Sequence, residues 1–280
     1  MSIPKQWTER IQNLPVLPQV AMKVTERMQS PTATVQEVSE LIRSDVGLTS
    51  KILRLANSSY YSIPGGVSDV AKALQYLGFN TIAQIVLTTS VFGSFKTSGL
   101  REFPLSQFWA HSFAVGLLAE ITARNLQFKN PSDAFIGGLM HDMGKLILLE
   151  LVPDELSRIV RHAEERKISF LKAEEELEVP NHIQLGMELG RHWHLPAPVI
   201  SAIQFHHGGG TKPEVVLIEW ANVWVHSRQI GASGSFQEDY SDEEQRLSEN
   251  LGIAARQNEI IEQHFRKEFE KAGALLAGVN

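Results

Sequence analysis

The sequence contains no cysteine among its 280 residues. This absence excludes thiolate metal ligands, a cysteine nucleophile and structural disulfides together. The fold must therefore rest on a hydrophobic core, and an apolar content of 43% is ample for a chain of this length. A reducing cytoplasm is the compartment that we expect for such a chain.

Signals for membranes and nucleic acids are missing as well. No apolar stretch approaches the roughly 20 residues that span a bilayer, and the opening MSIPKQWTER lacks the apolar run of a signal peptide. The net charge is −6 and no cluster of lysine and arginine stands out, whereas nucleic-acid binders usually show a basic face. We therefore expect a soluble, cytoplasmic protein without a membrane partner, and direct binding of DNA or RNA is disfavoured.

Helical periodicity dominates what is present. Val35, Val38 and Ile42 share one helical stripe, and Thr34 with Glu37 forms a capping-box start. Further helices are expected over 70–77 with a stop at Gly78, from about Ser106 past Leu118, after 131–133, over 214–228 and over 253–276. Alternating strand patterns of useful length are absent. The sequence predicts an all-α fold, a multi-helical bundle.

Two weak breaks suggest how the chain is divided. The residues Lys96–Gly99 end one helical set before Pro104, and the run GASGSFQEDYSDEE from Gly231 is small, polar and acidic. The predicted parts are an N-terminal helical subdomain (1–97), a helical bundle (98–230), a mobile acidic loop (231–247) and a C-terminal helix that packs on the bundle (248–280).

The segment AFIGGLMHDMGKLILL, residues 134–149, is the most informative in the chain. We interpret it as one apolar helix in which His141 and Asp142 are set, with Gly137-Gly138 allowing another helix to approach. Burying an imidazole and a carboxylate is costly unless they are paired or bind a cation, and this ligand pair suits Zn, Fe or Mn. Lys145 would lie beside the pocket as a phosphate contact. An equally weighted alternative is that His141 only caps or bonds to a neighbouring helix.

Other histidines occur in similar surroundings. A lone histidine on an apolar face is more often a satisfied core residue than a ligand, but several around one His-Asp pair favour a common pocket. The histidines assigned to this pocket are His111, His182, His206 and His207. Those assigned to the surface are His162, His192, His194 and His264.

Three strings in the N-terminal half resemble one family, the HDOD domain proteins, a degenerate branch of the HD-domain metal-dependent phosphohydrolases. They are LPVLPQVAMKV, ELIRSDVGLTSKILRLANSSYY and VSDVAKALQYLGFNTIAQIVL. The resemblance runs from about Leu14 to about Arg228. It implies an HD-like bundle for residues 98–230 and an HDOD subdomain for residues 1–97.

The resemblance also implies a metal-ligand set. His111 matches the first histidine of HD hydrolases and His141-Asp142 matches their pair, while His182, His206 and His207 resemble the extra histidines of two-metal enzymes. The later aspartate falls on Asn222, a departure that removes one negative charge and one candidate base. The Gly-Tyr-Pro signature of the two-metal enzymes is also missing. Glu219 could replace the carboxylate, although a solvated surface glutamate is the favoured interpretation.

Two functions stay open on this basis. The favoured one is a signalling output module that binds a signalling protein or a small nucleotide-like, phosphate-bearing ligand with little or no hydrolysis. The alternative is an active phosphodiesterase or phosphomonoesterase in which His141, Asp142 and Lys145 are catalytic. The turn around Asn57, Ser58, Tyr60 and Tyr61 is either a recognition surface or a cover for the junction between the halves. Because no receiver or membrane sensor segment is evident, we expect the input to come from a separate molecule.

Overall fold

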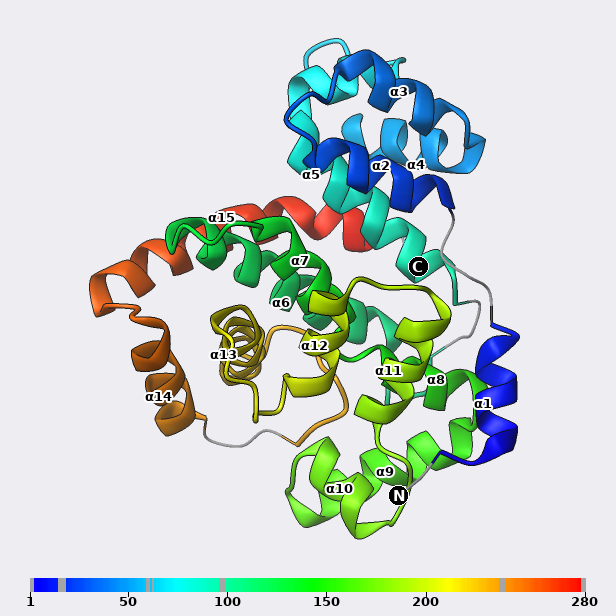
Figure 1. Ribbon diagram of the computed structural model, residues 1–280, viewed down its shortest axis with the longest axis vertical. Coiled ribbons are helices and arrows are strands. Elements are labelled where there is room, and N and C mark those ends of the chain that lie inside the picture. The colour runs from blue at the N-terminus through cyan, green and yellow to red at the C-terminus, as the bar shows by residue number, and fades with distance from the viewer. Residues whose placement is uncertain are drawn as a thin grey trace. The chain divides into compact units, whose positions relative to one another are not determined.

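The computed structural model describes residues 3–14, 19–58, 61, 63–95, 99–236 and 240–277, and every regular element among them is a helix (Figure 1). The all-α prediction is confirmed. No helix in the described part of the chain combines the length and the apolar character that a bilayer crossing needs. The helices are α1 (Lys5–Gln12), α2 (Gln19–Gln29), α3 (Val35–Arg43), α4 (Val46–Ala56), α5 (Val70–Gly93), α6 (Leu105–Asn125), α7 (Pro131–Met140), α8 (Met143–Leu151), α9 (Pro153–Arg166), α10 (Phe170–Glu176), α11 (His182–His192), α12 (Ala197–Phe205), α13 (Pro213–Ser227), α14 (Ser241–Leu251) and α15 (Ala255–Ala277).

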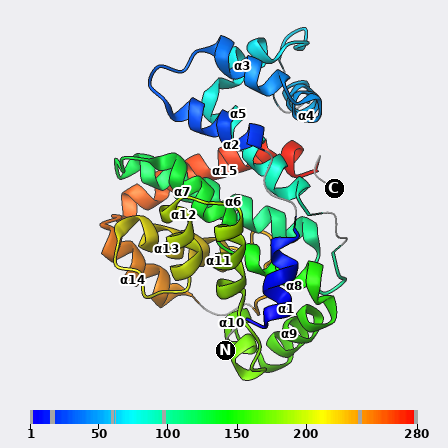
Figure 2. The same cartoon turned by 45° about the vertical axis from the view of Figure 1, so that its right-hand side comes forward.

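The chain divides into two compact units. Unit 1 comprises Met1–Leu14 and Thr97–Lys267, and unit 2 comprises Pro15–Lys96 and Glu268–Asn280. The expected boundary after residue 97 lies within one residue of this division. The first 14 residues, however, belong to unit 1, where α1 lies against α8 and α11 (Figure 2).

Unit 2 contains α2, α3, α4, α5 and the part of α15 from Glu268 onward. The expected C-terminal helix over 248–280 is therefore wrong in its bounds, because α14 ends and α15 begins within it and its last part belongs to unit 2.

The helix ends of unit 2 follow sequence signals. Thr34 and Glu37 form the expected capping box at the start of α3. Asp45 caps α4 by accepting a hydrogen bond from the backbone N–H of Leu48. At Gly78 the backbone turns to φ +79° inside α5. The helix breaks there as expected, because only glycine adopts this conformation without strain, but it resumes and continues to Gly93.

The Asn57 side chain holds the turn after α4. The Asn57 amide group donates to the carbonyl oxygen of Val67 and accepts from its N–H, both at 2.7 Å. These two bonds mimic a short piece of strand pairing and close the loop between α4 and α5. Of the residues named for this turn from the sequence, Tyr60 lies outside the described residues.

Unit 1 is centred on the pair α6 and α7, which cross at small residues. A Cβ added at Gly138 would lie 2.7 Å from the backbone of Gly116 on α6, and one at Gly137 would lie 2.9 Å from the Ala202 side chain on α12. The two glycines therefore let α7 approach two neighbouring helices closely. This confirms the close approach that the sequence predicted at Gly137-Gly138.

The expected single helix over 134–149 is wrong. α7 ends at Met140 and α8 begins at Met143, so His141 and Asp142 form the turn between two helices. The apolar run continues through the break, and periodicity alone therefore could not reveal it. The turn has a consequence for the site: it allows neighbouring side chains to converge, whereas successive residues of one helix point about 100° apart.

The expected mobile loop over 231–247 is also wrong in its second half. Residues from Ser241 to Leu251 form α14, and Asp242, Glu243 and Glu244 occupy its first turn. Acidic side chains there are stabilised by the positive end of the helix dipole. An acidic run thus marks a helix start at this point of the chain, not a solvated loop. In the first half, the N–H of Ala232 donates to the carbonyl oxygen of Gln107 at 3.1 Å, which ties this segment to α6.

Candidate metal centre

Asp142 lies at the middle of the buried polar cluster, and its two carboxylate oxygens face different partners. Oδ1 is 3.4 Å from His182 Nε2 and 3.3 Å from His206 Nε2. Oδ2 is 2.7 Å from Lys145 Nζ and 3.3 Å from His141 Nε2. One side chain in the turn between α7 and α8 therefore joins two sets of groups.

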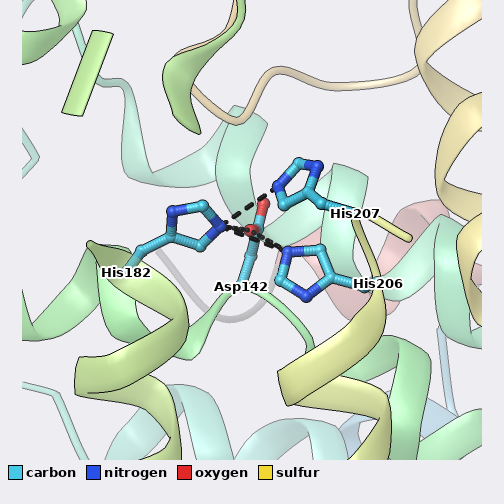
Figure 3. A group of neighbouring side chains, drawn as sticks. All are labelled: Asp142, His182, His206 and His207. Atoms are coloured by element: carbon cyan, nitrogen blue, oxygen red, sulfur yellow. Dashed lines mark hydrogen bonds and ion pairs between the residues drawn. The ribbon is translucent and has the colours of Figure 1, made fainter. Parts of the chain in front are cut away.

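The first set, which we call the three-histidine cluster, consists of Asp142, His182, His206 and His207 (Figure 3). His182 Nε2 lies 3.2 Å from Nε2 of both His206 and His207. One ligand atom from each of the four side chains lies within 4.8 Å of the others. His182, His206 and Asp142 are buried, whereas His207 is partly accessible. Imidazole nitrogens that converge beside a carboxylate are the donor set that divalent transition metals prefer.

Hydrogen bonds at Nδ1 orient the rings of two histidines around Asp142, His141 and His206. His141 follows α7 and His206 follows α12, and each ring contacts a carbonyl oxygen in the last turn of its own helix, Gly138 at 2.6 Å and Ile203 at 2.8 Å. Carbonyls at helix ends lack intrahelical partners, so they are free to accept. A donor at Nδ1 leaves the lone pair on Nε2, which faces the cluster.

His182 is oriented by a carboxylate. Its Nδ1 lies 2.7 Å from Glu174 Oε2, and its backbone N–H donates to Glu174 Oε1 at 2.7 Å. The position of His182 follows from the capping box of Asn181 and Gln184, which starts α11 at His182. Sequence reasoning missed Glu174, because the run LKAEEELEVP resembles a solvated acidic face.

The second set, which we call the His111 cluster, consists of His111, His141 and Asp142, whose ligand atoms also lie within 4.8 Å of one another. His111 Nε2 is 3.1 Å from Asn222 Oδ1 on α13. The predicted meeting of these four side chains is therefore confirmed. Their roles as metal ligands stay predictions.

His226 belongs to this region, and sequence reasoning missed it. It follows Asn222 by one turn of α13, and its ring centroid is 4.5 Å from that of His111. Its Nε2 lies 3.3 Å from the hydroxyl of Ser233. The i+4 spacing from Asn222 was the available signal, since residues one turn apart share a helix face.

Glu219 does not take the place of the missing carboxylate. It is buried, and its Oε1 lies 3.2 Å from Arg246 Nη2 on α14. The expectation of a solvated surface glutamate is therefore wrong as well. Burial raises the pKa of Glu219, against the effect of the guanidinium beside it.

The electrostatics of the site favour neutral imidazoles around a charged carboxylate. Burial lowers the pKa of His111, His182 and His207 well below the ordinary range, since a buried imidazolium loses its hydration. Burial and the charge of Lys145 lower the pKa of His226 to about 3. Neutral imidazole is the form that binds a metal.

Asp142 keeps its charge although it is buried. Burial alone would raise its pKa, but the Lys145 ammonium and the His141 ring hold that pKa well below the usual range. Lys145 is itself buried, and its Nζ lies 4.7 Å from the ring centroid of Phe170. The charges of Lys145 and Asp142 therefore compensate each other inside the bundle.

Two buried atoms indicate that the donor set fits a cation. Asp142 Oδ1 and His141 Nε2 are shielded from solvent and make no hydrogen bond in the described part of the protein. Buried polar atoms are nearly always partnered. Asp142, His182, His206 and His207 could hold a metal ion, and His111 with His141 and Asp142 forms a second candidate group.

Known proteins share this architecture. An HDOD domain protein of unknown function from Geobacter sulfurreducens is 24% identical, with a TM-score of 0.77 over 98% of this chain and 96% of that one. A proposed phosphohydrolase from Shewanella amazonensis SB2B is 21% identical, with a TM-score of 0.69 over 98% and 97% of the two chains. A proposed signal transduction protein from Marinobacter aquaeolei VT8 is 20% identical, with a TM-score of 0.74 over 100% of this chain and 62% of that one. At these identities the likeness concerns the fold.

Sequence comparison extends the likeness. An uncharacterised protein of Treponema pallidum (strain Nichols) is 24% identical over 210 residues, which make up 74% of this chain and 40% of that protein. The chain thus spans less than half the length of that relative. The family model of the HDOD domain matches residues 14–208. That match covers more than half of the sequence, and the chain belongs to the HDOD domain family.

Proposed function

We propose that this protein is an HDOD-type signalling output module whose buried site binds a divalent transition metal and a small phosphate-bearing ligand, with little or no hydrolysis. The observation that carries the proposal is the contact of His111 with Asn222. The resemblance to HD hydrolases places an aspartate there, and an amide in its place is neutral. An amide cannot accept a proton as a general base does.

The remaining groups favour binding over turnover. A divalent cation at this site would supply Lewis-acid charge next to a bound phosphate. Lys145 adds a buried ammonium, which is a point-charge phosphate contact. Asp142 is already engaged by that ammonium at 2.7 Å, so it is poorly placed to accept a proton. The described part of the site therefore has groups that attract an anion, and its central carboxylate is not free to act as a base.

The alternative is an active metal-dependent phosphohydrolase. One observation supports it: apart from the aspartate, every residue of the implied ligand set comes together, in two groups that share Asp142. The name of the Shewanella amazonensis relative points the same way, and that of the Marinobacter aquaeolei relative points to signal transduction.

Hydrolysis assays separate the two functions. Generic phosphomonoesters, phosphodiesters and cyclic dinucleotides should be tested with added Mn, Fe or Zn. We expect no turnover above that of the His141→Ala variant. Turnover in the native chain that His141→Ala abolishes would replace the signalling proposal with the enzyme.

The variant Asn222→Asp sharpens this test. If the missing carboxylate limits the site, the variant should bind metal more tightly and gain some hydrolysis. Glu219→Gln is a matched control on the same helix, since Glu219 contacts Arg246 and no ligand residue. An unchanged metal affinity in Asn222→Asp would show that the amide of Asn222 does not limit the site.

The partner of the module is proposed to be a signalling protein. Unit 2 and its Asn57-held turn are the candidate surface, because a helical unit without buried ionisable groups in its described part suits recognition. Pull-down with Asn57→Ala against the native chain should show loss of the partner. Retention of the partner by that variant would remove the turn from the proposal.

A further inference from the structure

We infer that the site holds one divalent ion, in the three-histidine cluster, and that the His111 cluster is closed to a second ion by hydrogen bonds of this chain. The inference rests on the metal binding proposed above and adds its place and number. The two clusters share Asp142 and form one site, but they differ in their capacity to bind an ion.

The three-histidine cluster is open for an ion because its inward atoms face one another, and no hydrogen bond or ion pair among the described residues joins them to a group outside the cluster. His182 and His206 both commit Nδ1 to an acceptor, the Glu174 carboxylate and the Ile203 carbonyl. Their Nε2 atoms therefore converge as lone pairs at 3.2 Å, next to an Asp142 Oδ1 that makes no hydrogen bond. Facing lone pairs repel each other, and a cation between them would convert this repulsion into ligation.

The His111 cluster is closed at its first ligand. His111 Nε2, the atom that would face an ion, is engaged by Asn222 Oδ1 at 3.1 Å. An ion there could use His141 Nε2, which makes no hydrogen bond to the described residues, but it would have to break the buried hydrogen bond of His111. The Asn222 oxygen that it would then face belongs to a neutral amide, which transition metals bind weakly.

His111 is also held in place from its other side. The His226 ring lies 4.5 Å away, and its Nε2 is 3.3 Å from the buried Ser233 hydroxyl. A Cβ at Gly231 would lie 2.4 Å from the backbone nitrogen of His111. Because the segment after α13 packs directly against α6, His111 has little freedom to turn toward a second ion.

Lys145 engages the Asp142 oxygen that faces the His111 cluster. Its ammonium lies 2.7 Å from Asp142 Oδ2, which is also 3.3 Å from His141 Nε2. The side chain is almost fully buried and its Nζ also contacts the Phe170 ring. The positive charge of Lys145 therefore already neutralises the carboxylate that both clusters share, and it would repel a second cation at Oδ2.

The charge balance supports one ion. Two carboxylates in the described part of the site, Asp142 and Glu174, face one ammonium, Lys145. Burial raises the pKa of Glu174 well above its usual range, so with neutral imidazoles the net charge is −1 when Glu174 is ionised and 0 when it is protonated. One dication would bring this charge to +1 or +2, and two dications would bring it to +3 or +4. Uncompensated buried charge is costly, and the first ion is therefore tolerated far better than the second.

Metal content measured by inductively coupled plasma mass spectrometry tests the number and place of the ion. The full chain is purified with Zn, Mn or Fe supplied in the growth medium, and about one ion per chain is expected. His206→Ala should lose the ion, whereas His111→Ala, the matched histidine of the other cluster, should retain it. Two ions in the native chain, no ion under any condition, or loss in His111→Ala with retention in His206→Ala would each overturn the inference.

A double variant tests the closure. Lys145→Met combined with Asn222→Asp removes the ammonium and supplies a carboxylate, and it should raise the metal content to about two ions per chain. A metal content that stays at one ion per chain would show that Lys145 and Asn222 do not close the His111 cluster.

Cobalt absorption spectra give a second readout, because the cobalt-loaded native chain and the cobalt-loaded His111→Ala variant should show the same band pattern. Circular dichroism checks that each variant is folded. None of these readouts depends on hydrolysis, so a failure of this inference is distinct from a failure of the proposed function.

Discussion

Units 1 and 2 differ most in what their interiors contain. In the described part of unit 2 the buried polar side chains are the hydroxyls of Ser39, Thr88, Thr89 and Ser90. Unit 1 buries ionisable groups in number, among them Asp142, Lys145, Glu174 and several histidines. Burying a charge is costly unless it is paired, and a protein in which hydrophobic residues replace a buried ion pair is often as stable as the original. Unit 1 therefore carries ionisable groups that stability alone does not require.

The largest loss of stability should come from a substitution at the helix contact that positions the site. A Cβ at Gly144 on α8 would lie 1.8 Å from the carbonyl oxygen of His182. Gly144→Ala must push α8 from α11, and we expect a loss of at least about 3 kcal/mol from overpacking against rigid backbone. Gly273→Ala on α15 is the matched control, because nothing lies within 4 Å of its Cβ, and it should stabilise by up to about 1 kcal/mol. Urea unfolding measures both, and equal effects would contradict the close contact.

Metal removal should destabilise unit 1 and leave the stability of unit 2 unchanged. If unit 1 holds an ion at a concentration of about 100 times its Kd, chelation should lower its stability by about 2.7 kcal/mol. Hydrogen exchange should then speed up in α7, α8, α11 and α12 and stay unchanged in α3 and α4. Equal acceleration in both sets of helices would show that the ion does not act through unit 1.

Loss of the central charge should have an intermediate effect. In ion-free protein, Asp142→Asn removes the partner of the buried Lys145 ammonium, and we expect a cost of about 1–3 kcal/mol. Asp69→Asn is the control in unit 2. It removes the charge that faces Arg43 on the surface while keeping an acceptor for the N–H of Ala71, and it should cost less than about 1 kcal/mol. A smaller loss for Asp142→Asn than for Asp69→Asn would reverse the comparison.

The smallest effect should come from a helix cap in unit 2. Thr34→Ala removes the acceptor for the N–H of Glu37 at the start of α3, and we expect a loss of about 1 kcal/mol. The metal content of the protein should not change, since the cap lies in the other unit. Thermal unfolding together with metal analysis checks both points, and a fall in metal content would contradict the separation of roles.

Local signals explain what the sequence could predict. The capping box at Thr34 and the close approach at Gly137-Gly138 depend on residues a few positions apart or on the absence of a side chain. The convergence of His111, His141 and Asp142 followed from the cost of burying polar groups in apolar segments. The metal roles of these residues remain predictions.

Features that depend on contacts between different helices could not be predicted. Glu174 is buried because it accepts from His182, and Glu219 because it faces Arg246, yet both occur among ordinary acidic residues. His226 packs on a residue more than 100 positions earlier in the chain. The break at His141-Asp142 was hidden because hydrophobicity continues across it. Sequence patterns report the period of a segment, and they do not report which distant group meets its polar side chains.

The hydrogen bonds at the ends of α7 and α12 have a consequence for how the site assembles. His141 and His206 contact a carbonyl oxygen three residues earlier in the chain, so each ring can be oriented as soon as its own helix end forms. His182 differs, because its Nδ1 depends on Glu174 from another helix. We therefore expect two of the imidazoles to be aligned early during folding, at a low cost in loop closure entropy, and the third to be fixed only when α10 docks beside α11.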